Sequence, residues 1–93
     1  MSMEKRAESK WLRTITSELP EGSSEVVYSG RRYGVTKTVF NQGKSFKVYA
    51  EELGGTDFIS LNLYLTDKGA LLKPCEMPAT KVRHFLEESI QLV

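Results

Sequence analysis

The chain has 93 residues, a formal net charge of +1 at pH 7 and one cysteine, Cys75. This length predicts a single domain whose thin core would gain from contact with a second copy. The near-neutral charge gives no overall attraction to nucleic acid or membranes, and a single cysteine excludes an internal disulfide framework. Because no apolar run would span a bilayer and the N-terminus lacks the apolar stretch of a signal peptide, we expect a cytoplasmic protein.

The N-terminal part of the chain predicts a short amphipathic helix over residues 4–17. Apolar residues recur there at helical spacing, namely Ala7, Trp11, Leu12 and Ile15. The β-branched run 14–16 weakens the end of this helix, and Pro20 followed by residues 21–24 predicts a flexible linker. We therefore expect helix and linker over residues 1–24, and the sheet with a C-terminal helix over residues 25–93. A frayed N-terminal arm is the alternative.

The middle of the chain predicts two consecutive β-hairpins. Apolar and polar residues alternate over 44–53 and 57–66, and Gly54-Gly55 between them suits a tight turn. Residues 26–28 and 32–40 predict an earlier hairpin that turns at Ser29-Gly30. A brief edge strand follows at residues 70–73.

The C-terminal residues predict an amphipathic helix from Ala79 to about Gln91, with Pro78 at its start. Its apolar stripe comprises Val82, Phe85, Leu86, Ile90 and Val93. Together the elements predict an α+β fold: an N-terminal helix, an antiparallel sheet of four to five strands in hairpin order, and a C-terminal helix packed on one face.

Alternation in the central hairpin predicts one buried and one open sheet face. The core-facing set is Phe46, Val48, Ala50, Ile59, Leu61, Leu63 and Leu65. The opposite set is Lys47, Tyr49, Phe58, Ser60, Asn62 and Tyr64. Aromatic rings beside a cation are suited to stacking unpaired bases and contacting a nucleic-acid backbone. Alternatively, Tyr49 and Tyr64 are ordinary cross-strand partners, or the N-terminal helix covers them through Trp11.

The distribution of charge adds to this picture. No Asp or Glu occurs between Val26 and Ala50, where the cations are Arg31, Arg32, Lys37, Lys44 and Lys47. If the strands pair as sequential hairpins, we expect these cations to gather on one half of the sheet and bind phosphates, with dimerisation doubling the local field. The alternative is a solvated sheet edge that its cations keep soluble.

Catalytic and metal-binding motifs are not recognised. His84 is the only histidine and lies on the predicted solvent face of the last helix, whereas Cys75 lies in a proline-framed segment suited to a buried thiol. For neither residue does the sequence supply the general base, orienting group and oxyanion donor that a catalytic site requires. We therefore expect no enzyme activity, no metal and no cofactor.

Several positions between Phe40 and Leu86 form a recognisable pattern: Gly43-Lys44, Val48, Gly55, Ile59, Leu61, Tyr64, Gly69 and Lys73-Pro74. In these positions the chain resembles the positive-cofactor-four family of transcriptional coactivators, a branch of the Whirly and Pur-alpha group of single-stranded nucleic-acid binders. The resemblance implies a curved antiparallel sheet, dimerisation partly through the C-terminal helix, and single-stranded DNA bound on the sheet. Lys44 matches a basic position of the family. Glu51 and Asn62 stand where it would place basic groups, and Leu53 and Leu65 where it would place aromatics.

The sequence thus predicts a small homodimer that binds single-stranded DNA or RNA in the manner of a transcription coactivator. The predicted contact residues are Arg31, Arg32, Lys37, Lys44, Lys47, Tyr49 and Tyr64. A protein-interaction module without nucleic-acid binding is the alternative. Scattered cations, with tyrosines buried beneath the N-terminal helix, would favour that alternative. A deep polar pocket holding Cys75 beside His84 would favour an enzyme.

Overall fold

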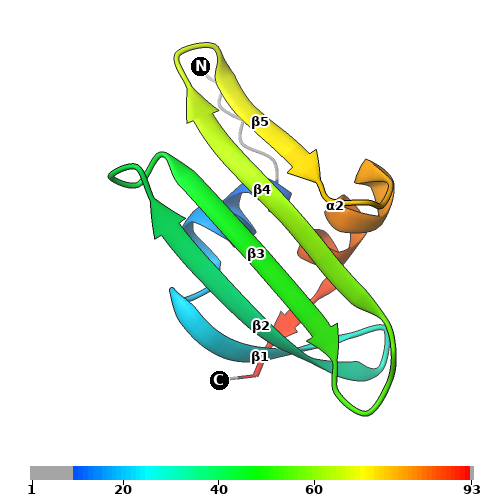
Figure 1. Cartoon of the computed structure of the whole chain (residues 1–93). Coiled ribbons are helices and arrows are strands. Elements are labelled where there is room, and N and C mark those ends of the chain that lie inside the picture. Colours follow the sequence, from blue (N-terminus) through cyan, green and yellow to red (C-terminus); the bar gives the residue numbers. More distant parts are fainter. Residues whose placement is uncertain (1–9, 93) are drawn as a thin grey trace, which may run out of the picture.

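The computed structural model describes residues 10–92, which form one antiparallel sheet with helical segments on one of its faces (Figure 1). The elements are α1 (Lys10–Arg13), the π-helical turn η2 (Thr14–Glu18), β1 (Gly22–Tyr28), β2 (Arg31–Phe40), β3 (Ser45–Glu52), β4 (Phe58–Thr66), β5 (Gly69–Pro74), α2 (Ala79–Glu88) and β6 (Ile90–Gln91). The strand order is β5-β4-β3-β2-β1-β6. The α+β class is confirmed, and so is the hairpin order for β1 to β5. Among residues 10–92, however, the sheet has six strands rather than four or five, because β6 pairs with β1 at the opposite edge.

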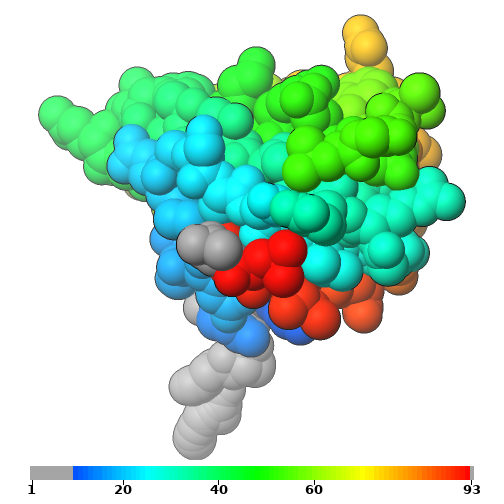
Figure 2. Space-filling view, turned by 90° about the horizontal axis from the view of Figure 1, so that it is seen from below, coloured from blue at the N-terminus to red at the C-terminus, as the bar shows by residue number. Residues whose placement is uncertain are grey.

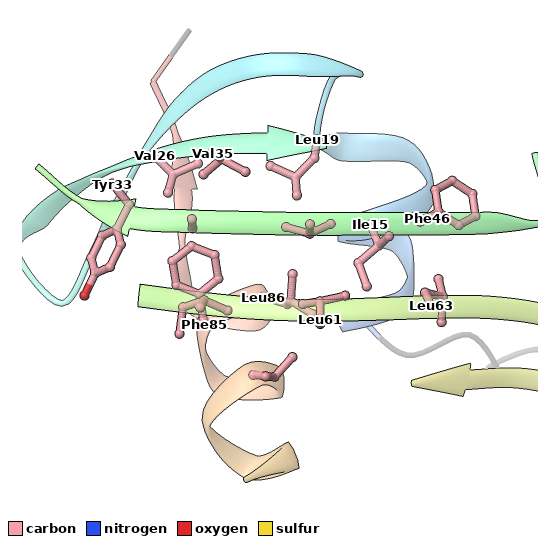
Figure 3. Close-up of a cluster of buried hydrophobic side chains, with 14 residues drawn as sticks. Ile15, Leu19, Val26, Tyr33, Val35, Phe46, Leu61, Leu63, Phe85 and Leu86 are labelled. Carbon is pink, nitrogen blue, oxygen red and sulfur yellow. The ribbon is translucent and has the colours of Figure 1, made fainter. Parts of the chain in front are cut away.

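The inner face of the sheet, which the helices cover, carries the core. In β3, the side chains of Phe46, Val48 and Ala50 are buried, whereas the alternating Lys47 and Tyr49 are exposed. The predicted core-facing set is confirmed except that Leu65 is only half-buried. The helical segments add Ile15, Leu19, Val82, Phe85 and Leu86 to the same cluster (Figure 3). Each fully buried side chain of this size contributes about 1.5–3 kcal/mol of hydrophobic stabilisation.

Phe85 holds α2 against β1 and β2. Its side chain is completely buried, and its ring lies edge-on to the rings of Tyr28 and Tyr33 at centroid distances of 5.0 and 5.4 Å. Edge-to-face pairs at such distances add to the stabilisation that burial provides. The aromatic cluster therefore fixes which face of the sheet α2 covers.

The N-terminal segment differs from its prediction in its helical geometry. The described part of the helix widens into the π-turn η2, in which the Leu19 N–H donates to the Thr14 carbonyl at 2.9 Å. The Thr14 hydroxyl lies 3.0 Å from the Lys10 carbonyl and 2.9 Å from that of Leu86, so it competes for helical acceptors and ties η2 to α2. The predicted helical residues 4–9 lie outside the described residues.

The predicted flexible linker is largely a strand. Residues Gly22, Ser23 and Ser24 pair with Lys37, Thr36 and Val35 of β2. Because β2 extends over ten residues, its backbone groups in this region need partners, and β1 supplies them. The boundary expected between residues 24 and 25 is therefore wrong.

The C-terminal helix ends earlier than predicted. It stops at Glu88, where the Ser89 N–H donates to the Phe85 carbonyl, and Ile90 and Gln91 then pair with Val27 and Val26. Figure 2 shows these C-terminal residues against β1. The open edge of β1 offers backbone hydrogen-bond partners, and pairing with them is favoured over continuing the helix that the periodicity of Ile90 predicts. Val93 lies outside the described residues. Within residues 10–92, no helix combines the length and apolar character needed to cross a membrane.

The loop between β3 and β4 is anchored to α2 through Asp57. One carboxylate oxygen accepts from the Lys81 ammonium at 2.7 Å, and the other accepts from the Tyr33 hydroxyl at 2.8 Å. These two hydrogen bonds, that of Lys81 first, lower the pKa of Asp57 below its ordinary value.

Replacing Asp57 with asparagine is expected to lower the free energy of unfolding by about 1–2 kcal/mol at pH 7, because both charge-assisted hydrogen bonds weaken. A carboxylate whose pKa is lowered by folding stabilises the protein fully above the unfolded pKa, here 3.8, and loses that effect as the pH falls through the folded pKa. As the pH falls below 3.8, the free energy of unfolding should therefore decrease less in the variant than in the wild type. Urea unfolding at several pH values measures this difference. Asp67→Asn, in an exposed turn, is the matched control, and an equal loss in both variants would contradict the anchor.

Candidate nucleic-acid interface

The face of the sheet opposite the helices is open in the described part of the chain. Figure 1 views the sheet with α1, η2 and α2 behind it. Strand register and alternation place the following side chains on this outer face: Glu25, Val27, Arg32, Thr36, Thr38, Phe40, Ser45, Lys47, Tyr49, Glu51, Phe58, Ser60, Asn62, Tyr64, Leu71 and Lys73. The central hairpin prediction of one core face and one open face is thus confirmed.

A polar row crosses the middle of the outer face. Lys47 of β3 is opposite Asn62 of β4, and Asn62 is opposite Lys73 of β5. Thr38 of β2 continues the row on the other side of Lys47. The two lysine side chains are exposed and stand on strands roughly 10 Å apart, with one strand between them. This row provides cations and hydrogen-bonding groups along one line.

Aromatic rings lie on both sides of this polar row. On one side, Tyr49 and Phe58 place their ring centroids 6.2 Å apart with an interplanar angle of 30°, and the two residues are 39% and 38% exposed. On the other side, Ser45 lies between Phe40 and Tyr64 in the register of the strands, and Phe40 is 41% exposed. Exposed rings beside cations provide the two kinds of contact that a single nucleic-acid strand requires.

Four of the predicted contact residues lie on this face: Lys47, Tyr49 and Tyr64 in the central hairpin, and Arg32 beside the β1–β2 turn. The N-terminal helix does not cover the two tyrosines, because Trp11 packs against the core on the inner face. The alternative in which that helix buries them is therefore wrong for the described residues.

The other predicted cations do not gather with Lys47. Arg31 and Arg32 follow the β1–β2 turn, where Arg31 binds Glu52 at 3.0 Å and Arg32 binds Glu25. Lys44 lies in the turn between β2 and β3, at the opposite end of these strands. Consecutive residues of a strand point to opposite faces, and successive turns lie at opposite ends of a meander. The prediction that the acid-free stretch gathers its cations on one half of the sheet is therefore wrong.

Lys37 is a buried residue rather than a surface cation. It is 5% exposed on the inner face, and its ammonium donates to the Leu19 carbonyl at 2.7 Å and lies 5.5 Å from the centre of the Phe46 ring. Burial lowers the pKa of Lys37, and the charge of Glu21 opposes this shift. Lys37 thus holds the end of η2 on the sheet, and its predicted phosphate contact is not supported by this position.

Sequence reasoning missed three contributors to the outer face: Phe40, Leu71 and Lys73. Alternation along β2 signals that Phe40 shares a face with Thr36 and Thr38. Lys73 and Leu71 need more information, because only the β4–β5 register shows that they lie opposite Asn62 and Tyr64.

His84 and Cys75 have separate local partners. The exposed His84 has its Nδ1 2.5 Å from the Tyr28 hydroxyl, and the half-buried Cys75 accepts a 3.6 Å hydrogen bond from the Asn62 amide. Residues 10–92 contain neither an enclosed pocket nor a group of three or more His, Cys, Asp and Glu side chains arranged for a metal ion.

Comparison of the chain with protein-family models, with curated proteins and with solved structures finds no match. The interface is therefore interpreted from its own residues.

Proposed function

We propose that this protein binds single-stranded nucleic acid on the outer face of its sheet. Lys47 and Lys73 would contact phosphates, and Tyr49, Phe58 and Tyr64 would stack unpaired bases. The observation that carries the proposal is the polar row with aromatic rings on both sides, on a sheet face that no described helix covers.

The contacts on this face favour a single strand over a duplex. Base faces are accessible to aromatic side chains only when the bases are unpaired and unstacked, whereas a duplex presents chiefly its backbone and groove edges. Each stacked base contributes about 1–3 kcal/mol, and each lysine adds a salt-sensitive phosphate contact. Stacking tolerates every base, so the proposal covers both DNA and RNA.

Titration of labelled protein with a single strand of about ten nucleotides, followed by NMR at low salt, is the direct test. We expect amide shifts concentrated in β3 and β4, weaker shifts with the matched duplex, and a slope of about −1.4 in log affinity against log salt, since each of two phosphate contacts contributes about −0.7. Shifts confined to α2, or none with either DNA or RNA, would contradict the proposal.

A protein partner is the second candidate, and the apolar content of the outer face favours it. The exposed large apolar residues on this face are Phe40, Tyr49, Leu53, Phe58 and Leu71. Neighbouring exposed apolar groups are typical of interaction surfaces, and the scattered cations also fit this reading. If neither DNA nor RNA shifts the outer-face amides in the titration above, a protein partner becomes the better interpretation.

Homodimerisation remains part of the proposal, with a different contact from the one that the family resemblance implies. Val82, Phe85 and Leu86 of α2 are already buried within their own chain. Within residues 10–92, strand β5 pairs only with β4, and its Leu71 is 48% exposed. Pairing of β5 with its copy around a two-fold axis perpendicular to the sheet would place two outer faces side by side.

A further inference from the structure

Glu51 is an unexpected charge beside the proposed stacking surface. Its side chain is exposed on the outer face, where register places it opposite Phe58 on one side and Gly34 on the other. Tyr49 precedes it by two residues on the same face. Among residues 10–92, no cation forms an ion pair with Glu51. A free carboxylate here repels phosphates, so it weakens binding unless the ligand donates hydrogen bonds to it.

On the β2 side of Glu51, Gly34 adds no side chain, and Leu53 covers its backbone. Gly34, in the middle of β2, has no positive φ, so its backbone conformation does not require glycine. A Cβ placed there would meet only the Leu53 Cδ2 atom, at 3.4 Å. Leu53 therefore packs over Gly34 at van der Waals distance, and this side of Glu51 is apolar. The carboxylate is thus bordered by Phe58 on one side and by the Gly34 backbone with Leu53 on the other.

The hydrogen-bonding pattern of a carboxylate selects among the bases. An ionised carboxylate only accepts, and its two oxygens match two adjacent donors. Guanine presents N1–H and N2–H side by side on its Watson–Crick edge. Adenine and cytosine place an acceptor nitrogen beside their amino group, and thymine and uracil place one N–H between two carbonyls. In a single strand this edge is free to be read while the ring stacks on an aromatic side chain.

We infer that Tyr49, Glu51 and Phe58 form a guanine-selective subsite, in which the base stacks on an aromatic ring and its N1–H and N2–H groups donate to Glu51. The inference rests on the proposed binding of single strands. Because a well-placed bidentate contact discriminates between bases, one guanine is expected to raise affinity about tenfold over thymine at the same position, or by about 1.4 kcal/mol.

The test uses a thymine-only DNA strand and the same strand with one central guanine, measured by fluorescence anisotropy with the full-length protein. The guanine strand is expected to bind about tenfold more tightly. Hypoxanthine at that position, which lacks the 2-amino group, should lose most of the gain, whereas 7-deazaguanine, which keeps the Watson–Crick edge, should retain it. Glu51→Gln should abolish the preference and raise the affinity for the thymine strand, because a negative charge near the phosphates is removed.

The outcomes separate the two proposals. Equal binding of the thymine and guanine strands would overturn the guanine subsite and leave single-strand binding in place. A preference that survives Glu51→Gln would also overturn the subsite. Binding of neither strand would overturn single-strand binding, and the subsite with it.

Discussion

Replacing Phe85 with alanine is expected to lower the free energy of unfolding by about 3–5 kcal/mol. The side chain is completely buried, and its loss would leave a cavity beneath the rings of Tyr28 and Tyr33. Domains of this kind have a total stability of about 5–15 kcal/mol, so the variant should be partly unfolded at moderate temperature. Urea unfolding followed by circular dichroism measures the change.

Leu71→Ala is the matched control for Phe85→Ala, since Leu71 is 48% exposed on the edge strand. Its loss should change the free energy of unfolding by about 0.5 kcal/mol or less in the monomer. Equal destabilisation by the two variants would contradict the packing of α2 on the inner face.

The sequence predicts the central hairpin well because local signals decide it. Alternation and the Gly54-Gly55 turn place the strands within a few residues of β3 and β4, and the same alternation separates the two faces. The two errors in the fold arise at the sheet edge. Residues 22–24 and Ile90 become strands because β2 and β1 provide backbone partners, and such long-range pairing leaves no mark in local composition.

Part of the candidate interface could be predicted for the same reason. Lys47 and Tyr49 lie two residues apart on one strand, so alternation alone places them together. The error at Lys37 was avoidable, because Tyr33, Val35 and Lys37 are spaced two residues apart on one strand. Lys37 therefore shares the inner face with the buried Tyr33 and Val35. Lys73 could not be placed in advance, since its position depends on how β5 pairs with β4.

Replacing Tyr49 with alanine is expected to weaken binding of a single strand by about 1–3 kcal/mol, the contribution of one stacked base. Tyr49 is 39% exposed, so the fold should tolerate the change.

Lys47→Ala should act differently, making the slope of log affinity against log salt less negative by about 0.7, because one phosphate contact is lost. Fluorescence anisotropy at several salt concentrations measures both effects.

Two further variants test whether the loss of affinity in Tyr49→Ala arises from stacking, and whether the change in salt slope in Lys47→Ala depends on the position of the cation. Tyr49→Phe keeps the ring and loses only the hydroxyl, so it should retain most of the affinity that Tyr49→Ala loses. Arg31→Ala removes a cation that is bound to Glu52 near the β1–β2 turn, so it should leave the salt slope unchanged. If Arg31→Ala made the slope less negative by as much as Lys47→Ala does, the nucleic acid would be held by charge around the whole sheet. The outer face would then have no special role, because charge alone has no preference for one face over the other.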